Sequence, residues 1–403
     1  MLGAVSPSRI TATLSFCLVA NLASLMTFPA VLPQASEAWG LTADEAGWIA
    51  SIYFAGYAAS VPILASATDR VDGRWIVGGC SLLGVVAGLA FAFLAGDFCA
   101  ALVLRFIAGM ALAGVHMPGL SLLSDRITSP AQGRSAAIYT SSYALGTSAS
   151  YLIAGAVEAL FGWRAVFVAG AIGPLLAMVA IALLPPAPPR HAITRTRAAF
   201  AGVWRNRPFM AYVLGFAGNT WEVFAIRVWF VACLTWTLGR PGNTLDLPNL
   251  ALLAGIASLA GVPASLLVAE LSARGRRADA IVATCIVSVA TCLALAATAG
   301  GNIHVVLALL VFLQIVSFAD VGTLGSGAVA HADPARRGAA LSIYALAGFT
   351  SGFAGPAAVG CVLGWFGGIG SEVAWTAAFL TMALGSTVTG IAVWTTQSSE
   401  RRA

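Results

Sequence analysis

The sequence predicts an all-α integral membrane protein whose twelve transmembrane helices form two six-helix bundles. Apolar residues make up 59% of the 403 residues and charged residues only 9%, and the mean hydropathy is +0.89. These values lie outside the range of soluble globular proteins. A bilayer core of about 30 Å requires roughly 20 apolar residues per helix. Charged or Gly/Pro-rich breaks separate twelve such spans: 12–34, 46–67, 75–95, 99–123, 135–157, 164–184, 209–236, 249–269, 279–299, 303–330, 339–363 and 373–395.

The first span follows Arg9 and has the position of a signal peptide. It is longer than the apolar part of a signal peptide, and no small-x-small cleavage site precedes Pro29 and Pro33. We therefore expect it to be retained as the first transmembrane helix.

The arginines indicate the topology of the remaining spans. All 21 basic residues are arginines; seventeen fall in alternate loops on one side, and only Arg164 and Arg240 fall on the other. Because cytoplasmic loops carry the excess positive charge, we expect both termini to be cytoplasmic, in the inner membrane of a bacterial-type cell. The net charge of +5 then reflects topology, and no nucleic-acid-binding module is recognisable.

A Pro-rich and then Arg-rich segment, 185–208, divides the spans into two groups of six. An internal repeat supports this division, because 129-SPAQGRSAAIY-139 before the fifth span resembles 333-DPARRGAALSIY-344 before the eleventh. We expect an N-terminal bundle at 1–184, a cytoplasmic linker at 185–208 and a C-terminal bundle at 209–403.

The loop 69-DRVDGRW-75 holds four charges between the second and third spans. With the preceding helix it resembles the helix 2 and loop 2-3 signature of the major facilitator superfamily. The family's loop positions are matched by Asp69, Arg70, Gly73 and Arg74, whereas Asp72 makes the loop one residue longer than its commonest form. Two further runs, 105-RFIAGMALAG-114 and 162-GWRAVFVAGA-171, resemble motifs of the same family.

The resemblance implies a secondary active transporter that works by alternating access, with helices 1, 4, 7 and 10 lining a central cavity. It also implies that the charged loop belongs to a cytoplasmic gate. In that gate Asp69 holds the end of helix 11 or nearby arginines when the cytoplasmic side is shut, and Arg70 and Arg74 pair with carboxylates such as Asp125. Gly73 allows a tight turn before the third helix.

Four charged residues lie inside the predicted spans, where each costs at least about 2.5 to 3.5 kcal/mol. They are Arg105, Glu222, Arg227 and Asp320, and they fall on helices 4, 7 and 10. Together with Asn21 and Gln314 they form our predicted substrate and proton cavity.

Each charge has two interpretations. Arg105 either holds an anionic substrate or bonds helix ends, and Glu222 either binds a proton or serves as an ion-pair partner. Asp320 is a second proton site or part of the gate. Arg227 lies about 140° around the helix from Glu222, so we expect its partner on a neighbouring helix.

Other polar and aromatic residues favour packing roles. His116, Trp221 and Trp229 are either cavity residues or packing residues, and the seven cysteines read as buried free thiols. No catalytic constellation, nucleotide-binding loop or metal-ligand spacing is present in the sequence, so we expect neither an enzyme nor a cofactor or metal.

The sequence therefore predicts a monomeric transporter of a small solute, coupled to protons. The substrate classes left open are a small organic or inorganic anion, a polar metabolite, or a drug or metabolite exported by proton-driven efflux. A membrane receptor or membrane enzyme is the alternative from another functional class.

Overall fold

The computed structural model describes residues 6–68, 70–127, 131–186, 202–243, 245–273, 276–333 and 336–400. Within these ranges the regular elements are helices. Eleven helical segments are long and apolar enough to cross a membrane, when Ile303–His331 is counted as one segment. The chain divides into two compact units. The first comprises Met1–Trp39, Ile52–Ile193 and Ala251–Gly255; the second comprises Gly40–Ser51, Thr194–Leu250 and Ile256–Ala403.

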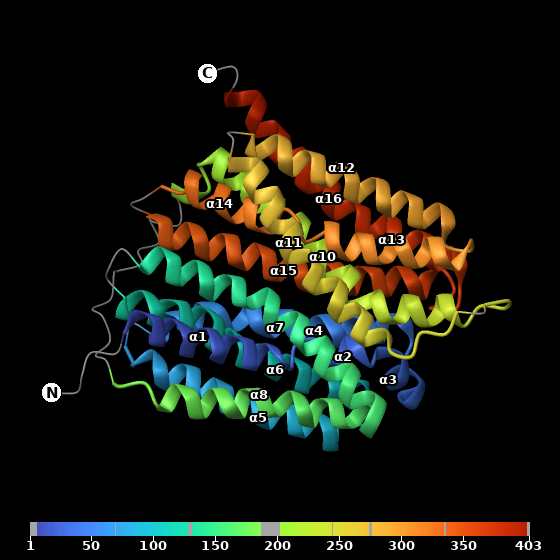
Figure 1. Cartoon of the computed structure of the whole chain (residues 1–403), viewed down its shortest axis with the longest axis horizontal. Coiled ribbons are helices and arrows are strands. Elements are labelled where there is room, and N and C mark those ends of the chain that lie inside the picture. Colours follow the sequence, from blue (N-terminus) through green and yellow to red (C-terminus); the bar gives the residue numbers. More distant parts are fainter. Residues whose placement is uncertain are drawn as a thin grey trace. The chain divides into compact units, whose positions relative to one another are not determined.

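The first unit is built from the N-terminal helices. Their bounds are α1 (Pro7–Leu22), α2 (Thr27–Ala30), α3 (Leu32–Trp39), α4 (Ala43–Ala67, whose first residues belong to the second unit), α5 (Gly73–Leu94), α6 (Phe98–Arg126), α7 (Gln132–Phe161) and α8 (Trp163–Ala182) (Figure 1). Helix α5 packs between α6 and α8, and α1 packs against α7 and α8.

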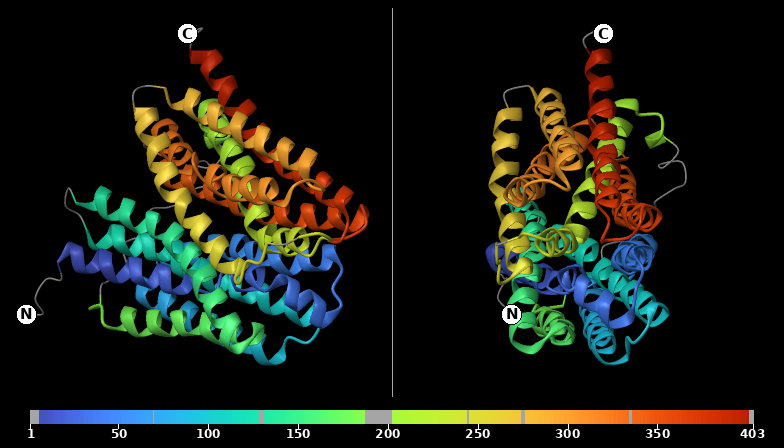
Figure 2. Two further views of the ribbon diagram at one scale, coloured as in Figure 1. Left: turned by 45° about the vertical axis from the view of Figure 1, so that its right-hand side comes forward. Right: turned by 90° about the vertical axis from the view of Figure 1, so that its right-hand side faces the viewer.

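The second unit is built from the C-terminal helices. Their bounds are α10 (Arg207–Leu238), α11 (Leu250–Ala273), α12 (Arg277–Thr298), α13 (Ile303–Val316), α14 (Val321–His331), α15 (Arg337–Trp365) and α16 (Glu372–Glu400). Helix α10 packs against both α15 and α16, and α12 runs beside α16, which is drawn in red in Figure 2. The most buried helix of this unit is α10, which carries Glu222 and Arg227.

The first predicted span is broken, whereas we expected one continuous helix over 12–34. Helix α1 ends at Leu22, a turn follows, and α2 and α3 complete the segment. Pro29 explains part of the break, since it has no N–H to donate to the carbonyl of Leu25 four residues earlier. With only 16 residues, α1 by itself is too short for a full span.

The predicted span 303–330 is also broken, although it contains no proline. Helix α13 ends at Val316 and α14 begins at Val321, with a turn over 317–320 between them. The Val321 N–H bonds to the carbonyl of Phe318 at 3.4 Å rather than to that of Ser317. The Ser317 carbonyl is thereby left for a partner outside the segment.

Two glycines bring α10 and α16 close together in the second unit. A Cβ on Gly218 would collide with the carbonyl oxygen of Gly385, and a Cβ on Gly385 would lie 2.5 Å from the carbonyl oxygen of Gly218 and 3.0 Å from the Cβ of Glu222. Only glycine allows the two backbones to approach this closely. The close approach places the α16 residue Ser386 within reach of Glu222.

Candidate functional site

Glu222 lies in the interior of the second unit and is fully buried. Its Oε1 accepts a hydrogen bond from the Ser288 hydroxyl at 2.7 Å and one from the Cys292 thiol at 3.3 Å, both from α12. Its Oε2 accepts a hydrogen bond from the Ser386 hydroxyl of α16. Glu222 is therefore surrounded by neutral donors from two neighbouring helices.

Asp320 lies in the turn between α13 and α14 and is 2% exposed. The side-chain amide of Asn219, on α10, donates to its Oδ1 at 2.8 Å, and the Sγ of Cys285 on α12 lies 3.9 Å from its Oδ2. The same amide nitrogen of Asn219 donates to the Ser317 carbonyl at 2.9 Å. Asn219 therefore satisfies the carbonyl that the break in this segment exposes.

One face of α12 contacts both carboxyl groups. Cys285, Ser288 and Cys292 are spaced by three and four residues, which places them on one side of a helix. Cys285 contacts Asp320, and the other two contact Glu222. Both carboxyl groups therefore belong to one buried polar cluster, and among the described residues neither of them forms an ion pair.

Arg105 is 3% exposed and holds the break in the first segment. Its Nη2 donates to the carbonyl of Leu25 at 3.0 Å, the carbonyl that Pro29 cannot use, and its Nη1 donates to that of Ser24 at 3.4 Å. Its guanidinium carbon lies 4.6 Å from the ring centroid of Tyr53, a cation–π distance. These contacts support the interpretation of Arg105 as a residue that bonds helix ends.

A small cavity adjoins Arg105 inside the first unit. It lies beside the break in the first segment, and its volume of about 20 Å³ is room for one water molecule. Its walls come from the break, α5, α6 and α8 (Ser24, Thr27, Gly84, Ala87, Gly88, Phe91, Leu104, Arg105, Ala108 and Phe167). A cavity of this size is too small for an organic solute.

The other predicted cavity residues are buried and make contacts within their own units. Asn21 donates to the Cys17 carbonyl at 2.9 Å and to the Ser81 hydroxyl at 3.1 Å in the first unit. In the second unit Gln314 donates to the Ser258 hydroxyl at 2.7 Å. The guanidinium carbon of Arg227 lies 4.9 Å from the ring centroid of Phe318, in the turn that precedes Asp320. The structure thus places Arg227 and Asp320 at the same break.

The aromatic and histidine candidates have hydrogen-bond partners inside the units. The Nδ1 of His116 lies 2.8 Å from the Tyr57 hydroxyl. Trp221 donates to the Thr381 carbonyl and Trp229 to the Pro356 carbonyl, both at 3.0 Å. These bonds agree with the packing interpretation of the three residues.

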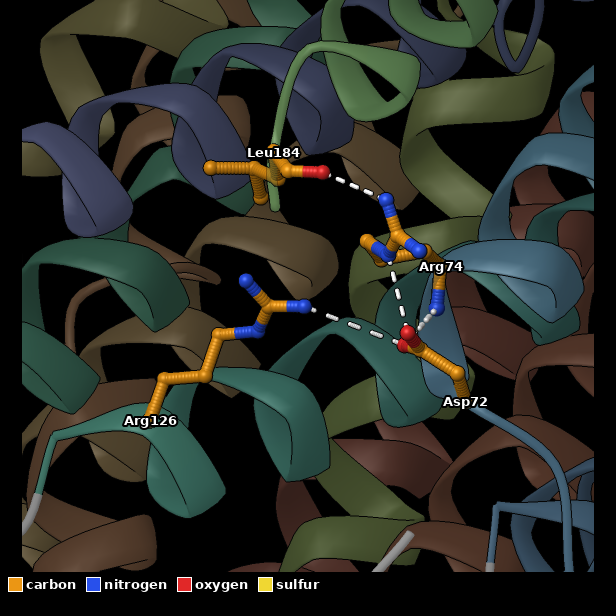
Figure 3. A network of polar contacts seen from close by, with 4 residues as sticks. All are labelled: Asp72, Arg74, Arg126 and Leu184. Atoms are coloured by element: carbon orange, nitrogen blue, oxygen red, sulfur yellow. Dashed lines mark hydrogen bonds and ion pairs between the residues drawn. The ribbon is translucent and has the colours of Figure 1, made fainter. Parts of the chain in front are cut away.

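The loop after α4 supplies a polar network at one end of the first unit. Asp72 caps α5 by accepting from the backbone N–H of Arg74 at 3.0 Å, and it pairs with the Arg74 side chain at 2.9 Å and with Arg126 at 3.8 Å. Figure 3 shows Asp72 between these two arginines, with Arg74 also directed at the carbonyl of Leu184. The network connects the start of α5 to the end of α6 and to Leu184, two residues after the end of α8.

The predicted gate residues are only partly included in this network. Asp69 lies outside the described residues, and Arg70 is exposed. Arg74 pairs with Asp72, the extra residue of the loop, whereas its pairing with Asp125 stays a prediction. Gly73 begins α5 without a positive φ, so the expected tight turn does not depend on glycine there; the Asp72 cap starts the helix instead.

Several residues of the polar cluster were absent from the sequence prediction. Ser288 follows Cys285 by three residues, and Cys292 follows Ser288 by four. This spacing predicts a polar stripe on one face of an otherwise apolar helix, so the sequence does contain a signal for these residues. Asn219 lies three residues before Glu222 on α10 and could have been found by the same criterion. Ser386 carries no such signal. Within the described residues no group of three or more His, Cys, Asp or Glu side chains could hold a metal ion.

Comparisons with known proteins agree with this architecture. The family model of the Major Facilitator Superfamily matches residues 14–356. A putative niacin/nicotinamide transporter, NiaP, of Bacillus subtilis is 26% identical over 224 residues, covering 55% of this chain and 52% of the relative. The niacin transporter NiaP of Acinetobacter baylyi is 31% identical over 159 residues, covering 40% of this chain and 36% of the relative.

A solved structure covers nearly the whole chain. The crystal structure of a bacterial homolog of the human lysosomal transporter Spinster, inward-facing and unoccupied, superposes with a TM-score of 0.79 at 16% identity, over 96% of this chain and 97% of the other. This likeness shows the fold, whereas the two curated relatives are matched over about half of their length or less. The chain therefore belongs to the Major Facilitator Superfamily, a superfamily of membrane transporters rather than enzymes.

Proposed function

We propose that this chain is a proton-coupled transporter of a small organic solute, with Glu222 and Asp320 as the groups that bind the proton. The observation that carries the proposal is the burial of both carboxyl groups among neutral partners, with no ion pair to any described residue. An ionised group in the bilayer interior costs at least about 2.5 to 3.5 kcal/mol on insertion scales. A bound proton removes that charge, so proton uptake and release change the free energy of the surrounding helices.

The first substrate to test is nicotinate, an aromatic monocarboxylate. Two curated relatives carry the printed name of niacin transporters, although this chain spans only about half of their length or less. Since the loop and the cavity charges do not fix a direction, uptake and efflux are both measured. Other small organic anions and amphipathic drugs complete the panel, because proton-driven efflux is the second candidate.

The experiment is flux in proteoliposomes with an imposed pH gradient. We expect the gradient to drive accumulation of at least one member of the panel. Glu222→Gln should abolish gradient-driven accumulation while substrate exchange without a gradient persists. Glu270→Gln, the same substitution on an exposed residue at the end of α11, is the matched control and should behave as the parent protein. Gradient-driven flux that is unchanged in both Glu222→Gln and Asp320→Asn would refute the assignment.

We further propose that the transporter works as a monomer in the inner membrane, with both termini cytoplasmic. The seventeen arginines on one side of the predicted topology support this orientation. Reporter fusions at the C-terminus, one active only in the cytoplasm and one only outside it, test the orientation. In this proposal the halves at 1–184 and 209–403, joined by the linker 185–208, move relative to each other during transport.

The gate role of Asp69 remains part of the proposal and rests on the family signature. Asp69→Asn should impair transport without loss of protein from the membrane, whereas Arg9→Gln should have little effect. Normal transport by Asp69→Asn would contradict a gate role for Asp69. The loop would then only carry the positive charges that set the topology and the structural contacts of Asp72.

A further inference from the structure

The side chain of Asn219, on α10, bonds both ends of the break between α13 and α14. One amide N–H of Asn219 donates to the Ser317 carbonyl at 2.9 Å, and the other donates to Asp320 Oδ1 at 2.8 Å. Ser317 and Asp320 are the first and last residues of the turn over 317–320. Asn219 therefore spans the whole turn, and both of its N–H groups are in use.

The carbonyl side of the same amide is unsatisfied. The Oδ1 of Asn219 is buried and accepts no hydrogen bond from the described residues, and the residue itself is 2% exposed. A buried acceptor without a donor is unfavourable by about 1 to 3 kcal/mol. An ionised carboxylate offers only acceptor atoms, so an ionised Asp320 cannot satisfy it.

A protonated Asp320 has the missing donor. A carboxylic acid and a primary amide form a closed pair in which the amide N–H donates to one carboxyl oxygen while the acid O–H donates to the amide oxygen. The first of these bonds is already present between Asn219 and Asp320. The second forms when Asp320 Oδ2 carries the proton and turns toward the amide oxygen of Asn219.

We propose that Asn219 is the positioning residue that links the proton on Asp320 to the shape of the broken segment, an inference that rests on the proposed proton coupling. With the proton bound, the closed pair holds Asn219 in place, and its second N–H fixes the Ser317 carbonyl. Release of the proton opens the pair, leaves two acceptors facing each other and loosens the hold on the turn. The bend between α13 and α14 then changes with the proton.

Other titratable and charged groups surround this pair. On α10 they are Glu222, bonded to Ser288, Cys292 and Ser386, and Arg227, which stacks over Phe318 of the turn. Cys285 of α12 lies 3.9 Å from Asp320 Oδ2, and Tyr344 of α15 interacts electrostatically with Asp320. Asn219 in addition bonds the backbone of the turn, through the Ser317 carbonyl.

The test is an infrared pH titration of the purified full chain in liposomes, which needs no substrate. The C=O band of the protonated Asp320 carboxyl is identified by its loss in Asp320→Asn. In Asn219→Leu we expect that band to change frequency, because the acid O–H loses the amide oxygen that accepts it. We also expect its midpoint to fall by about one pH unit, because the pair that favours the protonated acid is gone. Thr220→Val, next to Asn219, removes a hydroxyl that bonds only the backbone of α10 and α15, and it should leave the band unchanged.

A second variant separates the pair from general damage to packing. The exchange Asn219→Asp with Asp320→Asn keeps both volumes and keeps one acid opposite one amide. We expect it to restore a pH-titrating carboxyl band and to recover gradient-driven nicotinate flux relative to Asn219→Leu. An unchanged band or a raised midpoint in Asn219→Leu, or a double variant without a titrating carboxyl, would overturn the inference. A parent protein without pH-driven flux for any substrate of the panel would instead contradict the proposed function, while the infrared result stands by itself.

Discussion

Arg105 donates a 3.0 Å hydrogen bond to the carbonyl of Leu25, the carbonyl that Pro29 leaves without its helical partner. The same guanidinium bonds the Ser24 carbonyl and stacks on Tyr53. The guanidinium of Arg105, on the fourth transmembrane segment, thus donates its hydrogen bonds to the backbone of the first segment. This relationship explains why a charged residue is retained at a depth where charge is unfavourable.

Arg105→Gln should therefore destabilise the folded protein by about 3 kcal/mol, since it removes charge-assisted bonds to two buried carbonyl groups. Unfolding in mixed detergent micelles measures this loss, and the exposed Arg9→Gln is the control, expected to change little. A variant of parental stability with a raised KM for substrate would show that Arg105 holds the substrate instead.

The comparison of the first and tenth segments shows what hydropathy can and cannot predict. Both were predicted as single spans because a window of about 20 residues averages over a four-residue turn. In the first segment Pro29 and Pro33 indicate a break in the helix, whereas the turn 317-SFAD-320 contains no proline or glycine. There the break depends on a tertiary contact, the amide of Asn219, and such a contact has no local sequence signal.

The candidate site was predictable to a similar degree. Charge inside the membrane identified Glu222 and Asp320, because ionisable residues there are rare and functional as a rule. Their partners are neutral serine, cysteine and asparagine side chains, which occur throughout transmembrane helices. Only their spacing along α12 and α10 marks some of them in the sequence, and Ser386 has no such mark. The pairing of Glu222 with Ser386 of α16 follows from the close packing of Gly218 and Gly385, which only the structure shows.

Ser288→Ala removes one of the three donors to Glu222. We expect a loss of about 1 to 3 kcal/mol in the free energy of unfolding when Glu222 is ionised, and a smaller loss when it is protonated, because a protonated carboxyl group needs fewer donors. The effect should therefore be larger in alkaline than in acidic buffer. Ser342→Ala, which loses only a bond to the Gly338 carbonyl of its own helix, serves as the control. An equal loss at both pH values would contradict an ionisable role for Glu222.

Asp72 combines a helix cap with two ion pairs, and two substitutions separate these contributions. Asn is also a good N-cap, so Asp72→Asn should lose only the pairs with Arg74 and Arg126, about 1 kcal/mol. Asp72→Ala loses the cap as well and should cost about 1 kcal/mol more. Both values come from equilibrium unfolding of the purified protein. Asp333→Asn, whose partner Arg336 lies 4.0 Å away at an exposed site, should be close to neutral. Equal effects of the two Asp72 variants would mean that the cap contributes nothing.

Gly109 of α6 allows the contact between Arg105 and Tyr53, and its replacement tests the whole arrangement. A Cβ at this position would collide with the backbone carbonyl of Tyr53 on α4, and a backbone cannot rotate away as a side chain can. Gly109→Ala should push α4 from α6, separate Tyr53 from Arg105 and lower stability by about 3 kcal/mol or more, despite the better helix propensity of alanine. Gly79→Ala on α5 is the matched control, because a Cβ there meets nothing within 4 Å, and we expect it to be neutral or slightly stabilising. If both variants unfold at the same denaturant concentration as the parent protein, then α4 and α6 do not pack as closely in the bilayer as the contact of Gly109 with Tyr53 requires.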